Sequence, residues 1–384
     1  MRVLHLGKYF APFAGGIENF MLDLLPACSK LGVEQACLVH ESPGGANDEE
    51  HRFGFLSEFR RVPMLAQLSY APISPAFRRA LDEMIAGFEP DLLHIHMPNT
   101  SAFWALFDSR ARKLPWVVHW HSDVVGPGLD LKLKALYPFY RPLEQALLGR
   151  AGAVIATSPP YLESSRALAR WRDKCRVIPL GLDPARVAPD EAAGASPGDQ
   201  WRCGDKLRVL AVGRLSRYKG FDVLIRAAAA VEDVEVVIAG EGQERRRLER
   251  LLPDESTGRI RLVGAVDDAA RNGLMAGCDV LCMPSINRAE AFGLALVEAM
   301  AAGRPQIATR VAGSGMDWVV EEGRTGWMVS PGDEKELAAL LRRLARDRST
   351  VASFGAHARE QFEERFRIDA VAGQVVEMYR ALRE

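Results

Sequence analysis

Short apolar runs alternate with longer amphipathic stretches along most of the chain. In the first half, the apolar runs predict buried strands at residues 2–6, 36–40, 91–96, 116–119 and 152–156. The stretches between them, such as 17–31 and 74–87, predict helices. The runs are continuously apolar rather than alternating, which is typical of a parallel sheet covered on both faces. The first half is therefore predicted to be a doubly wound α/β domain.

The pattern breaks at residues 189–200, where small, polar, Pro and Gly residues replace the apolar periodicity. A second series of apolar runs then predicts strands at 207–212, 234–239, 260–263, 279–283 and 305–308. The tail from residue 334 onward has a helical pattern. This repeated alternation indicates two doubly wound Rossmann-like domains. We place them at residues 1–188 and 206–365, with a linker at 189–205 and a C-terminal helix at 366–384.

The composition narrows the function classes. A chain of 384 residues suits two domains of ordinary size. Its 49 basic and 50 acidic residues give a formal net charge of -1, so no overall field attracts nucleic acid. The six cysteines are scattered and indicate reduced, buried thiols. The chain starts MRVLHLG, without a signal-peptide pattern, and no apolar run has membrane-spanning length. We therefore expect a cytoplasmic protein, at most peripheral to a membrane.

Candidate chemistry gathers where the predicted strands end, which is where doubly wound sheets bind ligands. Gly15 and Gly16 follow the first strand and open a helix, so the backbone there can approach a diphosphate. This is not the Gly-x-Gly-x-x-Gly fingerprint, and no such fingerprint follows any predicted strand. The sequence therefore argues against a nicotinamide- or flavin-dependent oxidoreductase.

A basic loop, GRLSRYKG, follows the first strand of the second domain. Arg214 and Lys219 lie within this loop, which Gly213 and Gly220 bound. Arg offers a planar fork of donors and Lys a point charge, so the two can converge on a pair of phosphates. A solvated basic loop is the alternative interpretation.

Two carboxylates flank a helix start in the segment that runs from Ser285 to Gly303. Glu290 lies in the loop, Phe292-Gly293-Leu294 opens the helix, and Glu298 comes about two turns later. Glycine at the entry leaves the first N–H groups accessible to a diphosphate, with the helix dipole behind them. A carboxylate so placed can accept hydrogen bonds from ribose hydroxyls.

Two His-x-His pairs stand at strand ends: His94 with His96, and His119 with His121. Period-2 geometry puts each pair on one face of the sheet. With Asp91 or Asp123 they could ligate a transition metal, which is the metal-dependent hydrolase alternative. No His-Glu-x-x-His signature supports it. A histidine there is equally suited to hydrogen-bonding a sugar or acting near a leaving group.

The segment from Arg110 to Arg176 is basic, with Lys and Arg outnumbering Asp and Glu twelve to five. Aromatic residues are interleaved with these charges. A solvated basic face is one interpretation. The other is a surface that meets anionic lipid headgroups or a polyprenyl-diphosphate-linked acceptor.

In this order along nearly the whole chain, the motifs resemble those of the retaining family-4 glycosyltransferases of the GT-B fold. The matching strings are GGIE at 15–18, HSD at 121–123, VIPLGLD at 177–183, GRLSRYKG at 213–220, AGEG at 239–242, LVGAVDD at 262–268 and the Glu-x7-Glu pair at 290–298. The resemblance implies two Rossmann-like domains that face each other across a cleft. It also implies that the helix after Ile368 crosses back to the first domain, which would be the acceptor side.

The resemblance also implies roles for the charged residues. His121 would lie near the donor sugar and the transfer centre, and Arg214 and Lys219 would bind the diphosphate and stabilise it as it leaves. Glu290 would bind donor-sugar hydroxyls, and Glu298 would bind the ribose. Backbone contacts to the donor would come from Gly15, Gly16, Gly213, Val266, Phe292, Gly293 and Leu294. Arg, Lys and helix N–H groups then stabilise the leaving group, so no metal or cofactor is required.

The string VVHWHSDVV looks most like the mannosyl- and rhamnosyltransferases of bacterial O-antigen assembly, which use GDP-sugars. This implies transfer of mannose or rhamnose from GDP to a lipid-linked or polysaccharide acceptor in lipopolysaccharide biosynthesis. A UDP-sugar-dependent transferase, a nucleotide-sugar 2-epimerase and a non-catalytic binding module remain as alternatives. The chain departs from the family at Leu180, where Asn is usual, so a polar contact there is lost.

Overall fold

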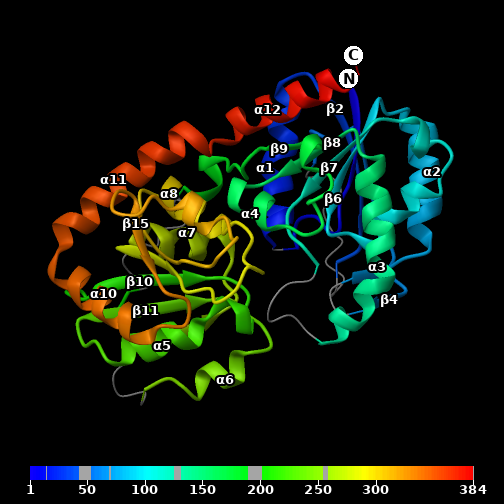
Figure 1. Ribbon diagram of the computed structural model, residues 1–384. Helices are drawn as coiled ribbons and strands as arrows, with labels where there is room; N and C mark the ends of the chain where they lie inside the picture. Colours follow the sequence, from blue (N-terminus) through cyan, green and yellow to red (C-terminus); the bar gives the residue numbers. More distant parts are fainter. Residues whose placement is uncertain are drawn as a thin grey trace. The chain divides into compact units, whose positions relative to one another are not determined.

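A computed structural model describes residues 1–13, 15–42, 53–68, 71–124, 131–188, 201–253 and 258–383. The chain divides into two compact units. Unit 1 comprises Met1–Gly181 together with Ile368–Glu384, and unit 2 comprises Leu182–Arg367. The expected pair of Rossmann-like domains is confirmed (Figure 1).

Unit 1 is built on a seven-stranded parallel sheet with the order β3-β2-β1-β6-β7-β8-β9. Its strands are β1 (Arg2–Leu6), β2 (Glu34–His40), β3 (Glu58–Val62), β6 (Leu92–Met97), β7 (Trp116–Trp120), β8 (Ala153–Ala156) and β9 (Cys175–Val177). A small antiparallel pair joins β4 (Ala66–Leu68) to β5 (Ala71–Ile73). The chain reverses its direction of sheet growth between β1 and β6, so these neighbouring strands form the topological switch point of unit 1.

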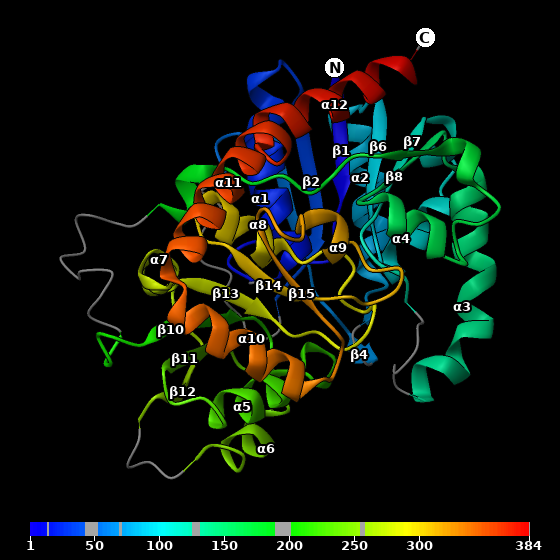
Figure 2. The same ribbon diagram turned by 60° about the vertical axis from the view of Figure 1, so that its left-hand side comes forward.

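The helices of unit 1 are α1 (Gly16–Lys30), α2 (Ala76–Phe88), α3 (Leu131–Arg150), α4 (Pro159–Ser164) and α12 (Ile368–Ala381). The C-terminal helix α12 packs beside α1, as both views show (Figures 1 and 2). Gly181 permits a close approach there, since a side chain at this position would come 2.8 Å from Val371. The last helix thus crosses back to the first domain.

Unit 2 carries a six-stranded parallel sheet with the order β12-β11-β10-β13-β14-β15. Its strands are β10 (Leu207–Val212), β11 (Val234–Ala239), β12 (Ile260–Gly264), β13 (Val280–Met283), β14 (Gln306–Thr309) and β15 (Gly326–Val329). This is the strand order of dinucleotide-binding Rossmann domains, with the switch point between β10 and β13.

The helices of unit 2 are α5 (Phe221–Ala229), α6 (Arg245–Glu249), α7 (Asp268–Gly277), α8 (Leu294–Ala301), α9 (Met316–Val319), α10 (Glu334–Arg346) and α11 (Arg348–Arg365). One core cluster joins the apolar strand residues to α5 and α10, which pack against each other (Figure 2). The strands are apolar along their length because helices cover both faces of the sheet.

The boundary between the units lies earlier than predicted. Residues 182–188, placed by the sequence in the first domain, pack on unit 2, where the Asn272 amide donates to the carbonyl oxygens of Arg186 and Ala188. Most of the expected linker lies outside the described residues. Its last part is anchored to unit 2, because the N–H groups of Arg202 and Cys203 donate to the Glu235 carboxylate.

Candidate functional site

The switch point of unit 2 brings two distant loops together. Strands β10 and β13 are neighbours, so the loops at their carboxyl ends are neighbours as well. The loop after β10 contains Gly213 to Gly220 and ends in a short 3-10 helix (Arg217–Lys219). The loop after β13 runs from Pro284 to Gly293. Both predicted anion-binding motifs therefore meet at one sheet edge.

Close backbone contacts hold these two loops against each other. The N–H of Ile286 donates to the carbonyl oxygen of Tyr218 at 2.8 Å. Gly220 has φ 66°, and any side chain there would collide with the carbonyl oxygen of Pro284. Only glycine satisfies both the left-handed backbone and the lack of space. Glycine at position 220 thus sets the distance between the loops.

Lys219 and Glu290 form an ion pair across the junction, with Nζ 2.5 Å from Oε2. Both side chains are nearly buried, at 12% and 11% exposure. Burial by itself lowers the pKa of Lys219, but the attraction of Glu290 outweighs it, and the pKa is raised above its usual value. The Ser285 hydroxyl also donates to Glu290 Oε2 at 3.3 Å. The ion pair and this hydrogen bond therefore fix both side chains in place.

Arg214 lies in the same loop with an exposed side chain. Its positive charge opposes the rise in the pKa of Lys219. Gly213, with φ 148°, lies beneath Lys219, whose Cε and Nζ are 3.3 Å from the position of a Cβ there. The structure thus places Arg214 and Lys219 in one loop and brings Lys219 into contact with Glu290.

Helix α8 begins beside this cluster. Gly293 stands at its N-cap with φ 83°, a conformation that glycine adopts without strain. Phe292 is 3% exposed and packs against Trp318 and Phe366, and Leu294 is 9% exposed. Their side chains belong to the core, so only their backbone groups can contact a ligand. Helix N-termini present N–H groups without intrahelical partners, which favours an anion.

Glu298 lies on the buried side of α8 and pairs with Arg186, whose Nη1 is 3.1 Å from Oε1. The exposures of the two side chains are 11% for Arg186 and 6% for Glu298. Arg186 was not predicted, because it lies far from Glu298 in the chain and outside any phosphate-binding pattern. Glu298 therefore has a buried cationic partner within unit 2.

Val266 lies in the loop between β12 and α7, half-buried. Asp267 caps α7 by accepting from the N–H of Ala270 at 2.8 Å, which fixes the loop. Strand β12 is two strands away from β10 in the sheet. Val266 is thus at the same sheet edge as the cluster, two strands away from the loop that follows β10.

In unit 1, α1 begins at Gly16, directly after β1 and its loop. The space beyond Gly16 is open. Glu18 lies in the first turn, with its carboxylate against Gly15. A carboxylate at this helix start disfavours a second anion, because like charges repel. The glycine pair therefore suits a neutral ligand better than the expected diphosphate.

Five histidines are packed together in unit 1 at the carboxyl ends of β1, β6 and β7. They are His5, His94, His96, His119 and His121, and each is at most 5% exposed. Burial lowers the pKa of His121 to about 3, so its imidazole is neutral at physiological pH. The sequence missed His5, since one histidine in an apolar strand carries no functional signal.

The metal hypothesis fits these histidines poorly. Two groups of three have nitrogens within 4.8 Å of one another, and both consist of histidine alone. His119 and His121 are stacked with their planes only 4° apart, so their in-plane lone pairs do not converge. Asp91 precedes β6 and accepts from the N–H of Arg2, whereas Asp123 accepts from Trp120 and Ser165. Neither carboxylate joins a histidine group in the described part of the chain.

Two further features of unit 1 bear on the predictions. Leu180 is 6% exposed, so it fills apolar space where the family has an amide.

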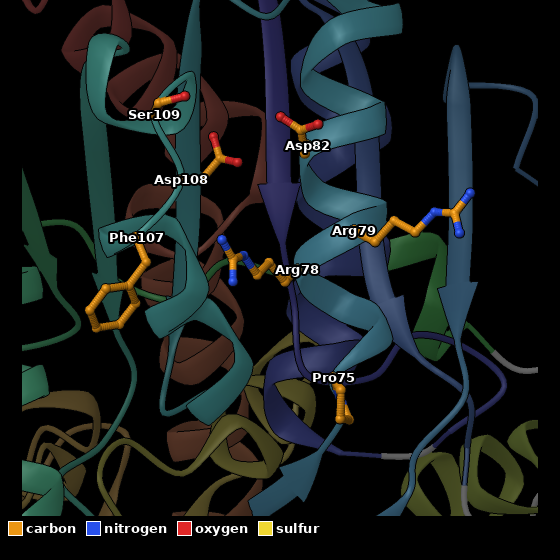
Figure 3. Close-up of a pocket in the computed structure, with 7 residues that line it drawn as sticks. All are labelled: Pro75, Arg78, Arg79, Asp82, Phe107, Asp108 and Ser109. Atoms are coloured by element: carbon orange, nitrogen blue, oxygen red, sulfur yellow. The ribbon is translucent and has the colours of Figure 1, made fainter.

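A shallow depression lies elsewhere on the surface and is lined by Pro75, Arg78, Arg79, Asp82, Phe107, Asp108 and Ser109 (Figure 3). None of the predicted site residues lines it, and Arg79 points away from the Phe107 side.

Comparisons with known proteins agree with this arrangement. Residues 15–181 match the family described as glycosyl transferase 4-like domain, and residues 206–347 match glycosyl transferases group 1. The O-antigen chain mannosyltransferase C of Escherichia coli is 28% identical, over 100% of this chain and 99% of that protein. A phosphatidyl-myo-inositol mannosyltransferase of Mycobacterium tuberculosis is 30% identical, over 88% and 85%. The D-rhamnosyltransferase WbpZ of Pseudomonas aeruginosa is 28% identical, over 95% and 92%.

Solved structures share the fold. HepE of Anabaena, solved with UDP, aligns at a TM-score of 0.76 and 22% identity, covering 99% of this chain and 100% of that one. Sucrose-phosphate synthase of Thermosynechococcus elongatus aligns at a TM-score of 0.80 and 24% identity, covering 99% and 98%. The chain therefore belongs to the family-4 glycosyltransferases, and its two parallel-sheet units are the two halves of the GT-B fold.

Proposed function

We propose that the protein transfers mannose or rhamnose from a GDP-sugar to a lipid-linked or polysaccharide acceptor, with retention of the anomeric configuration. The observation that carries this proposal is the cluster at the switch point of unit 2. Arg214, Lys219 and the N-terminus of α8 supply positive charge there, and Glu290 lies within the same cluster. The similarity to mannosyl- and rhamnosyltransferases supports the choice of sugar.

In this proposal the diphosphate binds between the loop after β10 and the start of α8. Arg214 and Lys219 stabilise the charge that develops on the leaving diphosphate, since preorganised cations act where charge grows in the transition state. Glu290 accepts hydrogen bonds from sugar hydroxyls while Lys219 holds its carboxylate in place. Glu298 binds the ribose, and the backbone near Val266 contacts the base.

The stabilisation of the leaving group by Arg, Lys and N–H groups needs neither metal nor cofactor. We expect turnover to be the same with and without EDTA. Retention is read from the anomeric coupling in the NMR spectrum of the product. A product with inverted configuration, or an activity that EDTA abolishes, would contradict these parts of the proposal.

The base of the donor is the least constrained part. HepE was solved with UDP, so a UDP-sugar-dependent transferase is the second candidate. A thermal-shift panel of GDP, UDP, ADP and dTDP separates the two, because a ligand at a hundred times its Kd stabilises the folded state by about 2.7 kcal/mol. We expect GDP to give the largest shift. A larger shift with UDP favours the second candidate.

Two neighbouring arginines test the site itself. Arg214 and Arg217 are both exposed and lie in the same loop, but only Arg214 is assigned to the diphosphate. We expect Arg214→Ala to lower turnover at least about tenfold, which corresponds to roughly 1.4 kcal/mol of barrier. Arg217→Ala is the matched control and should stay near wild type. Equal losses in both variants would mean that the overall positive charge of the loop, and not Arg214 itself, is responsible.

The family membership leaves the epimerase and hydrolase alternatives without support. Incubation with GDP-mannose still distinguishes the outcomes, since a transferase releases GDP when acceptor is present, an epimerase returns an altered nucleotide sugar, and a binding module returns the donor unchanged.

We also propose that helix α3 contacts an anionic membrane surface. Phe139 is 79% exposed and Leu136 is 40% exposed, one helical turn apart, and Arg141 of the same helix is exposed as well. Apolar side chains beside cations are typical of interfacial helices. None of the helices in the described part of the chain is both long and apolar enough to cross a bilayer.

Several other cations of the basic segment are engaged within the protein. Arg150 donates to the carbonyl oxygens of Arg112 and Leu114, and Lys174 donates to those of Gly149 and Ala151. The membrane proposal therefore depends on α3 rather than on the whole segment. Phe139→Ser should weaken sedimentation with anionic liposomes at low salt, whereas Phe107→Ser, a matched control at 59% exposure, should not. Absence of binding by the wild-type protein would exclude the proposal.

A further inference from the structure

The buried histidines of unit 1 are linked by hydrogen bonds that run from β2 through β1 and β6 to the residue after β7. The linked side chains are Gln35, His5, His96 and His121. Strands β2, β1, β6 and β7 are consecutive neighbours in the sheet (Figure 2). The orientation of the Gln35 amide decides which ring nitrogen donates and which accepts in each of these hydrogen bonds.

Gln35 has a fixed amide orientation. Its Nε2 lies 2.6 Å from the carbonyl oxygen of Leu25, which can only accept. The same Nε2 donates to Ser29 Oγ at 2.8 Å, and Ser29 in turn donates to the carbonyl oxygen of Phe55. The NH2 group must therefore face Leu25 and Ser29. Oε1 is left to face His5 Nε2 at 3.0 Å, and it can only accept.

The direction then passes from ring to ring. Burial lowers the pKa of His5 to about 3 and that of His96 well below its ordinary value, so both rings are neutral and each has one N–H and one lone pair. His5 donates from Nε2 to Gln35, so its Nδ1 accepts from His96 Nε2 at 3.3 Å. His96 Nδ1 then carries no hydrogen, and its lone pair accepts a hydrogen bond from His121 Nε2 at 3.1 Å.

We propose that Gln35, His5 and His96 are positioning residues that hold His121 in the Nε2–H tautomer, so that its Nδ1 offers a lone pair to a hydroxyl group of the ligand. Nδ1 is buried and has no hydrogen-bond partner among the described residues. An uncharged ring nitrogen with a lone pair accepts a hydrogen bond from a hydroxyl group. It does not bind ionised phosphate oxygens, because these are acceptors as well. The choice of a sugar or acceptor hydroxyl rests on the proposed function, whereas the tautomer does not.

His119 provides a control for the chain. It is fully buried and stacked on His121 with ring centroids 4.2 Å apart, yet neither of its ring nitrogens has a hydrogen-bond partner among the described residues. Replacing His119 by Phe keeps a ring in the stack and leaves the hydrogen bonds from Gln35 to His121 in place. His96→Phe keeps a ring as well but interrupts those bonds.

The test is nitrogen NMR of the full-length protein with labelled histidine, where a protonated and an unprotonated ring nitrogen have well-separated shifts. We expect the Nε2–H tautomer at His121 in the wild type at neutral pH without ligand. A Nδ1–H tautomer overturns the proposal, and this measurement needs no variant to fold. Addition of GDP alone should leave the Nδ1 shift unchanged, and addition of the nucleotide sugar should move it. A shift with GDP alone would assign Nδ1 to the nucleotide instead.

The variants test what the tautomer does. His96→Phe and Gln35→Leu should give His121 a mixture of tautomers and lower turnover about tenfold or more, with the Kd for the nucleotide unchanged. His119→Phe should change neither the tautomer nor the turnover. An unchanged tautomer in both His96→Phe and Gln35→Leu overturns the role of the chain. If no nucleotide sugar is consumed by the wild type, the proposed function fails while the tautomer assignment stands.

Discussion

Replacing Lys219 by methionine removes the cation that faces Glu290 at the switch point of unit 2. Both side chains are about one-tenth exposed, so Glu290 would lose its cationic partner in a largely desolvated place and keep the hydrogen bond from the Ser285 hydroxyl. Loss of one partner of a buried ion pair costs about 3–5 kcal/mol. We therefore expect Lys219→Met to destabilise unit 2 by about this amount as well as to lower turnover at least tenfold.

A double variant separates the two effects. Lys219→Met combined with Glu290→Gln removes both charges while keeping similar volumes, and Ser285 can still donate to the amide oxygen. Replacement of a buried pair by neutral groups is often close to neutral for stability. The double variant should therefore lie within about 1 kcal/mol of wild type, which makes it about 2–4 kcal/mol more stable than Lys219→Met alone. Its turnover should stay as low as that of Lys219→Met.

The stability of unit 2 is best measured by native-state hydrogen exchange on peptides from β10 and α8, because unfolding of a chain with two units need not be two-state. Turnover is measured as release of nucleotide from the donor with acceptor present. A double variant no more stable than Lys219→Met would refute the ion-pair argument. Near-normal turnover in either variant would refute the assigned roles.

Three further predictions concern single positions. Burial raises the pKa of Glu144 to about 7, from an ordinary value of 4.5, so the folded state holds a proton that the unfolded state loses. Stability should fall by about 3 kcal/mol as the pH rises from about 4.5 through 7, and Glu144→Gln should remove that dependence in melts followed across this range. Gly240 has φ 148°, and a side chain there would collide with the carbonyl oxygen of Gly213. Gly240→Ala should cost at least about 1–3 kcal/mol, and an unchanged melting temperature would contradict this. Glu298→Gln should weaken nucleotide binding about tenfold in calorimetry without abolishing turnover at saturating donor. An unchanged Kd would contradict the assignment of Glu298 to the ribose.

Much of the fold could be predicted from the sequence because both sheets are parallel and buried. Continuous apolar runs placed β1, β10 and β11 at the residues that the structure gives. Strand β3 was missed because it is an edge strand with one buried residue of five, EFRRV. Helix α3 is hard to predict from the sequence because it contains Pro138 and Pro142, and proline is unfavourable inside a helix.

The candidate site was predictable where a local pattern carries the chemistry. A glycine-bounded basic loop after a strand indicates anion binding, and so does a glycine at a helix start. Both signals can be read from the sequence because backbone freedom and charge are local properties. That pattern identified Arg214, Lys219 and Glu290 individually. It could not show that Lys219 and Glu290 form an ion pair, since their contact depends on the pairing of β10 with β13 and on the close approach at Gly220.

The sequence by itself thus determined the fold class, the family and the donor-side motifs, because these depend on periodicity and on short spacings. Only the tertiary structure decided which polar groups are partners. Arg186 meets Glu298 across 112 positions of sequence, and Gln35 orients His121 through two rings on intervening strands. Burial makes such partnerships strong, since a desolvated charge or lone pair needs a fixed partner. Burial and distance are properties of the folded chain, so no local pattern could reveal them.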